Sequence, residues 1–275
     1  MTAPQYYVHD IDPVLLPIYG DFGIRYYGLA YLLGFVACAW LLHKYYKAGK
    51  SPLNPEQQST ALIILVLGVL VGGRLGHIFL YDLPETLRDP LNVFRVWEGG
   101  MASHGGFAGV IFGGWVISRM YHMRFLSFGD LLTTLAPPGL MLGRVANFIN
   151  GELWGTPSTA PWAVIFPQSA PPGTPLELIT PRHPSQLYEA ALEGLFLIIY
   201  TQWRLWRTDV LKHPGRLGGE FLLLYAVVRI IGEQFRAPDS SRLFGMNRGV
   251  FYSIFLAIAG IYLIIRSYRV GPVKQ

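Results

Sequence analysis

The chain has 275 residues, of which 52% are hydrophobic and only 14% are charged. Soluble domains carry about a quarter charged residues, so this composition excludes an ordinary soluble domain and indicates a membrane protein. The net charge of +5 comes without a basic patch interleaved with polar helix or strand, which argues against nucleic-acid binding. The single cysteine, Cys38, excludes an intrachain disulfide and is interpreted as a small core residue.

Seven apolar stretches approach the roughly 20 residues that a membrane-spanning helix needs. In chain order they cover 24–43, 60–81, 104–121, 130–149, 187–203, 218–236 and 249–268. The fourth contains Pro137 and Pro138, and the sixth carries charged side chains. We therefore expect an all-α integral membrane protein with seven transmembrane helices.

The distribution of Lys and Arg predicts how these helices are oriented. With the N-terminus outside, twelve of the 22 basic residues fall in cytoplasmic segments and seven in outer segments. This bias predicts an N-out, C-in topology.

One long segment, 150–186, separates the fourth and fifth stretches and holds eight of the twenty prolines. Aromatic residues such as Trp154, Trp162 and Phe166 punctuate it, which indicates an ordered irregular structure rather than a disordered linker. No internal repeat is evident. The simplest organisation is a single membrane domain over 1–275, with 150–186 as a small irregular cap on the outer face.

Polar residues gather at the outer end of the fourth stretch, in "GRVANFINGELWG" (143–155). Arg144 and Asn147 are three residues apart and share a helix face. An arginine at that depth costs several kcal/mol, so its presence favours a function.

In the predicted topology, four other helix ends point polar residues toward the same leaflet. The sixth stretch carries Tyr225, Arg229 and Arg236 on one helical stripe, with Glu233 beside it. His104 opens the third stretch in "SHGGFAGV", Tyr27 lies in "RYYG" at the start of the first, and "HPSQLYE" (183–189) opens the fifth.

Two arginines in apolar surroundings are suited to a lipid phosphate, because guanidinium groups bind phosphate in a bidentate manner and keep their charge. A histidine at a helix N-terminus favours its neutral form, which suits His104 to act as a general base. Structural interpretations stay open: Arg144 and Arg229 as ion pairs with Glu152 and Glu233, and His104 as a helix cap.

Two further structural interpretations concern other residues. Tyr27 and Tyr225 are also compatible with an aromatic interface belt. Arg74 lies among Gly68, Gly72 and Gly76, a pattern typical of close helix packing, and is assigned no chemistry. No Cys/His spacing for a metal and no phosphate-binding loop occurs in the sequence, so we expect neither metal nor cofactor.

The motif "GRVANFINGELWG" resembles the signature of the prolipoprotein diacylglyceryl transferases. Five further blocks resemble that family in the same order: "RYYGLAYLLGF", "GGRLGHIFLYD", "FRVWEGGMASHGG", "RHPSQLYEA" and "YAVVRIIGEQFRAPD". The resemblance implies an enzyme of the bacterial cytoplasmic (inner) membrane with its active site toward the periplasmic face. Its partners would be phosphatidylglycerol, the lipobox segment of a prolipoprotein, and membrane lipids.

The activity that this resemblance implies is the first step of lipoprotein maturation. The sn-1,2-diacylglyceryl group passes from phosphatidylglycerol to the lipobox cysteine thiol, and glycerol 1-phosphate leaves. By the same resemblance Arg144 holds the lipid headgroup, with Asn147, Asn150 and Glu152 in its block. Arg229 lies with Tyr225, Glu233 and Arg236, while His104 and Tyr27 complete the set.

Two rival functions from other classes fit the composition. A lipid or anion transporter would place arginines within spans, but inverted repeats and polar groups at mid-membrane would be expected. A structural membrane subunit would not need five polar helix ends that converge.

Overall fold

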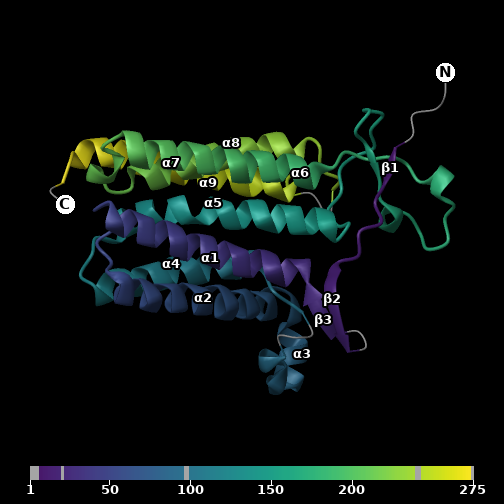
Figure 1. Cartoon of the computed structure of the whole chain (residues 1–275), viewed down its shortest axis with the longest axis horizontal. Helices are drawn as coiled ribbons and strands as arrows, with labels where there is room; N and C mark the ends of the chain where they lie inside the picture. Colours follow the sequence, from purple (N-terminus) through teal and green to yellow (C-terminus); the bar gives the residue numbers. More distant parts are fainter. Residues whose placement is uncertain (1–5, 20–21, 96–98, 239–242, 274–275) are drawn as a thin grey trace. The chain divides into compact units, whose positions relative to one another are not determined.

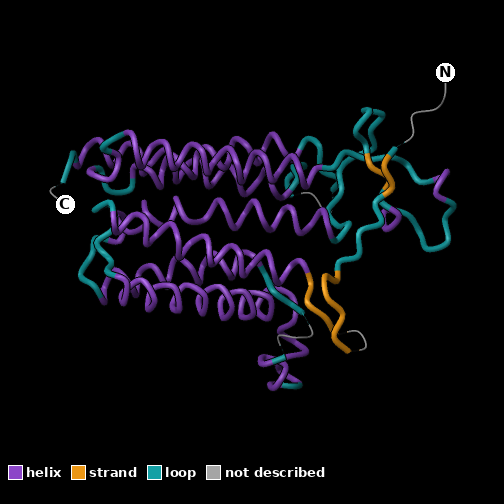
Figure 2. Tube along the Cα trace, viewed as in Figure 1, coloured by secondary structure: helices purple, strands orange, loops and turns teal. Residues whose placement is uncertain are grey.

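The computed structural model describes residues 6–19, 22–95, 99–238 and 243–273. The chain forms two compact units, residues 1–38 with 133–275 (unit 1) and residues 39–132 (unit 2). Helices dominate each unit, and the longest loops belong to the segment between α5 and α6 (Figures 1 and 2).

Unit 1 combines short strands with most of the helices. Strand β1 (Tyr7–Val8) pairs in parallel with β4 (Val164–Ile165), and β2 (Val14–Tyr19) pairs antiparallel with β3 (Phe22–Arg25). Helices α1 (Tyr26–Lys47) and α5 (Phe125–Ile149) belong to this unit as far as Cys38 and from Thr133, respectively. The others are α6 (Ser185–Glu189), α7 (Leu197–Arg207), α8 (Arg216–Glu233) and α9 (Arg248–Val270). A π-helix, η6 (Ala190–Phe196), joins α6 to α7, and 3-10 turns form η4 (Pro167–Ser169), η5 (Leu176–Leu178) and η7 (Val210–Lys212).

Helices α7, α8 and α9 run side by side in Figure 1. A Cβ atom at Gly219 of α8 would lie 2.8 Å from the carbonyl oxygen of Gly260 in α9, so the two backbones approach closely only because both residues are glycine. Leu197, Phe221 and Val228 form the buried apolar core beside them.

Helix α5 continues through Pro137 and Pro138, the feature that weakened its prediction as a span. Because Pro138 has no N–H, the carbonyl oxygen of Thr134 loses its helical donor. The Nε2 of Gln202 donates to that oxygen over 3.4 Å. A side chain from a neighbouring helix thus replaces the missing backbone bond, as happens in membrane proteins.

The segment after α5 is irregular and ordered, as its prolines and aromatic residues led us to expect. Its β4 strand pairs with β1, and isolated bridges join Gly155 to Arg236 and Val164 to Arg182. Phe166 is fully buried, and its ring lies 6.1 Å from that of Phe148 in α5. These contacts attach the segment firmly to the end of α5.

Unit 2 contains the end of α1 and the start of α5. Its other helices are α2 (Pro55–His77), the π-helix η1 (Ile78–Asp82), α3 (Leu83–Arg88), the 3-10 helix η2 (Pro90–Phe94) and α4 (Ser103–Met120). A reciprocal capping box begins α2, in which Asn54 accepts from the Gln57 N–H and Gln57 accepts from the Asn54 N–H.

Close packing of α2 against α4 depends on glycine, and Figure 1 shows the two helices side by side. A Cβ atom at Gly76 would lie 2.6 Å from the Cα of Gly105, and a Cβ atom at Gly68 would lie 2.6 Å from the Gly109 oxygen. Arg74 is buried and donates to Gly99 O over 2.8 Å and to Asn92 Oδ1 over 2.9 Å. The packing interpretation of this glycine stretch is confirmed.

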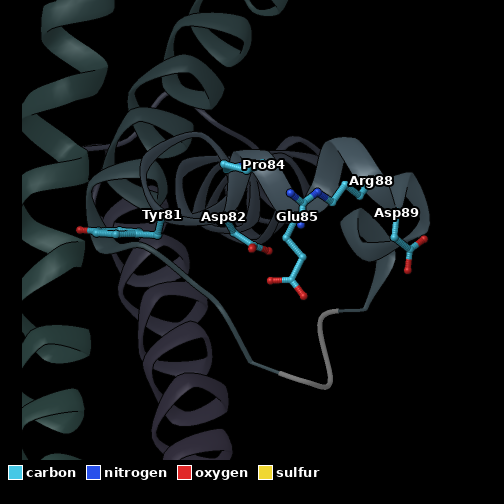
Figure 3. A pocket seen from close by; sticks show the side chains of 6 residues that line it. All are labelled: Tyr81, Asp82, Pro84, Glu85, Arg88 and Asp89. Atoms are coloured by element: carbon cyan, nitrogen blue, oxygen red, sulfur yellow. The ribbon is translucent and has the colours of Figure 1, made fainter.

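An open pocket of about 620 Å³ in unit 2 lies along η1 and α3 (Figure 3). Its lining carries the carboxylates of Asp82, Glu85 and Asp89 and the guanidinium of Arg88. It contains none of the residues predicted to form the site, so its size does not identify it as the active site.

A helix covers most of each of the seven predicted stretches. Four helical segments of the described chain are long and apolar enough to cross a membrane: Tyr26–Lys47, Pro55–Arg88, Phe125–Ile149 and Arg248–Val270. On α9, Phe255, Ile258 and Tyr262 are exposed, which suits a surface that faces lipid. The chain is therefore a mostly helical membrane protein, whereas seven crossings and the N-out topology remain predictions. The four short strands were not predicted.

Candidate active site

Arg144 of α5 and Arg229 of α8 meet at two glutamates. Glu189 Oε2 lies 2.8 Å from Arg144 Nη1, and Glu189 Oε1 lies 2.6 Å from Arg229 Nη1. Glu193 repeats the arrangement, with Oε2 at 3.0 Å from Arg144 Nη2 and Oε1 at 3.1 Å from Arg229 Nη1. Each carboxylate bridges both guanidinium groups, so the two arginines share one site within unit 1.

The local structure from α6 into η6 explains why both glutamates reach the arginines. Glu189 ends α6, and Glu193 lies in the π-helix that follows. A Cβ atom at Gly194 would lie 2.7 Å from the Cα of Met141, so the π-helix approaches α5 one turn from Arg144. Single π-helical turns inside α-helices are frequent at functional sites.

Burial separates the carboxylates from the guanidinium groups. The side chains of Glu189 and Glu193 are 0% exposed, whereas those of Arg144 and Arg229 are 17% and 13% exposed. A carboxylate removed from water must be paired, and here each one accepts from two arginines. The two glutamates are thus fully enclosed, whereas the two arginine side chains keep a small accessible surface.

Two more charged residues extend the network at the end of α8. Arg229 Nη2 lies 2.9 Å from Glu233 Oε2, and Arg236 Nη1 lies 3.3 Å from Glu189 Oε1. A Cβ atom at Gly249, in the first turn of α9, would lie 2.9 Å from the Glu233 carboxyl carbon, so only glycine leaves room there. These six residues are called the paired-arginine network below: Arg144, Glu189, Glu193, Arg229, Glu233 and Arg236. With all six ionised, three positive and three negative charges balance.

A second polar cluster lies on the following turn of α5. Asn147 Nδ2 donates to Glu152 Oε1 over 2.7 Å and to the hydroxyl oxygen of Tyr27 over 3.4 Å. Tyr225 connects with the arginines instead, since its hydroxyl lies 3.5 Å from Glu193 Oε2. Asn150 makes no such contact, and its buried Oδ1 has no hydrogen-bond partner among the described residues.

The structure therefore gathers most of the predicted site residues, all of them in unit 1. They are Tyr27, Arg144, Asn147, Glu152, Tyr225, Arg229, Glu233 and Arg236. His104 is exposed and occupies the second position of α4 in unit 2. Its role as a base stays a prediction.

The structural alternative of ion pairing is half right. Arg229 does pair with Glu233, but Arg144 pairs with Glu189 and Glu193 while Glu152 accepts from Asn147. Glu189 and Glu193 were not predicted as site residues. The signal that could have found them is the one that identified Arg144, namely an ionisable residue within an apolar stretch. No cluster of three or more metal-ligating side chains occurs in the part of the chain that the structure describes.

Comparison with known proteins assigns the family. A family model described as prolipoprotein diacylglyceryl transferase matches residues 13–266. The chain belongs to the prolipoprotein diacylglyceryl transferase family.

Relatives named phosphatidylglycerol–prolipoprotein diacylglyceryl transferase match nearly the whole chain. The protein of Zymomonas mobilis subsp. mobilis is 44% identical over 90% of this chain and 84% of its own length. The protein of Ruegeria pomeroyi is 40% identical over 95% of this chain and 97% of its own length. The protein of Bradyrhizobium diazoefficiens is 41% identical over 94% of this chain and 92% of its own length. The resemblance read from the sequence motifs is thereby confirmed.

Proposed function

We propose that this chain is an enzyme that transfers the diacylglyceryl group of phosphatidylglycerol to a prolipoprotein, the first step of lipoprotein maturation. Family membership and the printed names of the relatives support this activity. The observation that carries the site assignment is the convergence of Arg144 and Arg229 on the same two buried carboxylates.

Arg144 and Arg229 bind the phosphate of phosphatidylglycerol in this proposal. A guanidinium has five N–H donors. The contacts of Arg144 with Glu189 and Glu193 use Nε, Nη1 and Nη2 once each, which leaves two N–H groups for a ligand among the described residues. Glu189 and Glu193 fix both guanidinium groups before the lipid arrives. Donors fixed in advance stabilise developing charge without reorganisation at the moment of reaction.

The reaction is a displacement at carbon. The thiolate of the lipobox cysteine attacks the glyceryl carbon that carries the phosphate ester, a carbon–sulfur bond forms, and the carbon–oxygen bond breaks. Glycerol 1-phosphate leaves with the bonding electron pair, and the two arginines neutralise the charge that grows on it. The thiol proton passes to a base, because a free thiol is only slightly ionised near neutral pH.

We assign His104 to that proton transfer or to orienting the lipid. His104→Gln then lowers the rate of transfer, and a changed pH profile of the rate distinguishes the base from the orienting role.

The remaining polar residues complete the lipid site. Tyr27, Asn147 and Glu152 form one hydrogen-bonded set that we assign to the headgroup glycerol. Asn150 is assigned to the same set on the strength of its position in the motif. Glu233 holds Arg229 directly. Tyr225 contacts Glu193 and Arg236 contacts Glu189, so we assign both to support of the arginines through these carboxylates.

We further propose seven crossings with the N-terminus outside, as a single membrane domain with 150–186 as its periplasmic cap. The site then faces the periplasmic side of the bacterial inner membrane, where a secreted substrate emerges. The family match and the four apolar helical segments support the membrane part of this assignment. A transporter or a structural subunit is not favoured, since the relatives that match along the chain are named as transferases.

The test supplies the purified protein with phosphatidylglycerol and a synthetic lipobox peptide. Mass spectrometry should show a diacylglyceryl thioether on the peptide, together with released glycerol phosphate. A peptide with serine in place of cysteine should remain unmodified. Movement of lipid across vesicles without any thioether product would contradict the proposal and favour a transporter.

A further inference from the structure

A small cavity of about 190 Å³ lies in the segment attached to the end of α5. His9, Asp10, Ile11, Gly151, Phe166, Pro167 and Gln168 line it, and it is called the cap pocket below. Its walls come from both sequence segments of unit 1, since His9 follows β1 while Phe166 and Gln168 follow β4. None of the residues assigned to the lipid site lines it.

His9 is held in the cap pocket with a polar atom unused. Its ring lies 5.3 Å from the ring of Phe148 and 5.4 Å from that of Phe166, and its backbone N–H donates to Ile165 O. The residue is only 6% exposed, and its buried Nε2 has no hydrogen-bond partner among the described residues. An unsatisfied buried polar group costs roughly 1–3 kcal/mol, so a bound group that forms a hydrogen bond with Nε2 would recover part of that cost.

Gly151 keeps the cap pocket open. Its φ of +65° is a conformation that residues with a side chain rarely adopt. A Cβ atom there would lie 3.1 Å from His9 Cε1 and 3.6 Å from Gln168 Nε2, so any other residue would fill the space between them. Gly151 directly precedes Glu152, which places the pocket next to the proposed lipid site along the chain.

The lining favours a neutral hydrogen-bonding group. The imidazole of His9, the carboxylate of Asp10 and the carboxamide of Gln168 offer acceptors and donors, whereas no Lys or Arg is present. An anionic phosphate would meet the Asp10 carboxylate and find no cation. The fully buried Phe166 ring supplies an apolar wall. Hydroxyls, carboxamides and main-chain amides fit this combination, and a polypeptide carries all three.

We infer that the cap pocket binds a neutral polar group of the prolipoprotein, in the residues that follow the modified cysteine. This inference rests on the proposed function, in which the cysteine attacks the lipid held by Arg144, and adds that the residues after the cysteine pass along the segment that follows α5. The pocket then sets which residues after the cysteine are preferred, separately from the phosphate contacts.

The experiment uses four lipobox peptides, one with alanine at the three positions after the cysteine and three with a single serine at one of them. Wild-type protein should prefer one serine peptide over the alanine peptide by about fivefold to tenfold in kcat/KM. His9→Phe keeps an aromatic ring and removes Nε2, so it should abolish that preference while the KM for phosphatidylglycerol stays unchanged. Gln168→Ala, at an exposed position, should reduce the preference with less risk to folding.

A matched control is Glu177→Ala, an exposed change in the same segment outside the pocket, which should leave the preference intact. Serine preference that survives in both His9→Phe and Gln168→Ala overturns the inference, as does a rise in the KM for phosphatidylglycerol without a change in preference. Wild-type protein that modifies none of the peptides contradicts the proposed function instead.

Discussion

Two clusters of arginine and glutamate lie along α8, and they differ in how many carboxylates hold the arginines. In the paired-arginine network, each of Glu189 and Glu193 bridges two arginines from different helices. Near the start of α8, a single carboxylate, Glu220, accepts from Arg204 Nε over 2.7 Å, Arg216 Nε over 2.6 Å and the Tyr200 hydroxyl over 3.0 Å.

We interpret the Glu220 cluster as a structural connection between helices. Arg216 also donates to the hydroxyl of Tyr268 over 2.6 Å, so the cluster connects α7, α8 and α9. The side chain of Arg204 is 17% exposed, the same fraction as Arg144. Burial and ion pairing therefore do not by themselves mark an active site, and Arg204 provides a control matched in exposure and partner chemistry.

The largest expected effect separates the two clusters by activity. Arg144→Lys and Arg229→Lys should each lower diacylglyceryl transfer by about 100- to 1,000-fold, because lysine keeps the charge but loses the planar fork that holds phosphate and carboxylate together. Arg204→Lys should change the rate less than about threefold per folded molecule. Rates of glycerol phosphate release, normalised to folded protein, measure the difference. Equal losses in all three variants would make both clusters structural.

Substitution of the glutamates separates the two clusters by comparing their effects on stability and on turnover. Removing one partner of a buried ion pair typically costs about 3–5 kcal/mol, so Glu220→Gln should lower the free energy of unfolding by about 3 kcal/mol without changing turnover of the folded protein. Glu193→Gln should lower both stability and turnover, the latter by about tenfold, since Arg144 and Arg229 lose a shared anchor. Unfolding in detergent followed by circular dichroism, beside the transfer assay, checks both. Normal turnover in Glu193→Gln would show that this anchor is not required.

The smallest expected effect is a change in stability from glycine substitutions in unit 2, where the contact between α2 and α4 has no proposed catalytic role. Gly105→Ala should destabilise the protein by about 2 kcal/mol, because the new Cβ atom would lie 2.8 Å from the Cα of Gly76. At Gly106 the nearest atom is 3.9 Å away, so Gly106→Ala should stabilise the helix by about 0.5–1 kcal/mol. Thermal unfolding of the Gly105→Ala and Gly106→Ala variants measures the difference in stability. Equal shifts would contradict the glycine packing of α2 and α4.

Hydropathy placed the helices well because lipid-facing segments must be both apolar and hydrogen-bonded internally. The same reasoning brought Arg144 and Arg229 into one hypothesis, and the structure joins them. Glu189 and Glu193 carry a signal in the sequence as ionisable residues within an apolar stretch. Their pairing with the arginines carries none, since that geometry includes the π-helix from Ala190 to Phe196. A hydropathy pattern does not reveal where an α-helix changes to a π-helix.

The alternative pairing of Arg144 with Glu152 is wrong for a local reason. After α5 the chain turns at Gly151, whose φ is +65°, and Asn147 takes the Glu152 carboxylate. The cap pocket was likewise invisible in the sequence, because His9 and Gln168 meet only through the pairing of β1 with β4. Such long-range contacts leave no periodic signal.

In the proposed function, Arg144 and Arg229 together hold one lipid phosphate. Equilibrium binding of phosphatidylglycerol to wild-type protein, Arg144→Lys and Arg204→Lys in nanodiscs of zwitterionic lipid tests it most directly. Binding should be at least tenfold weaker for Arg144→Lys and unchanged for Arg204→Lys. Wild-type affinity in Arg144→Lys would contradict it.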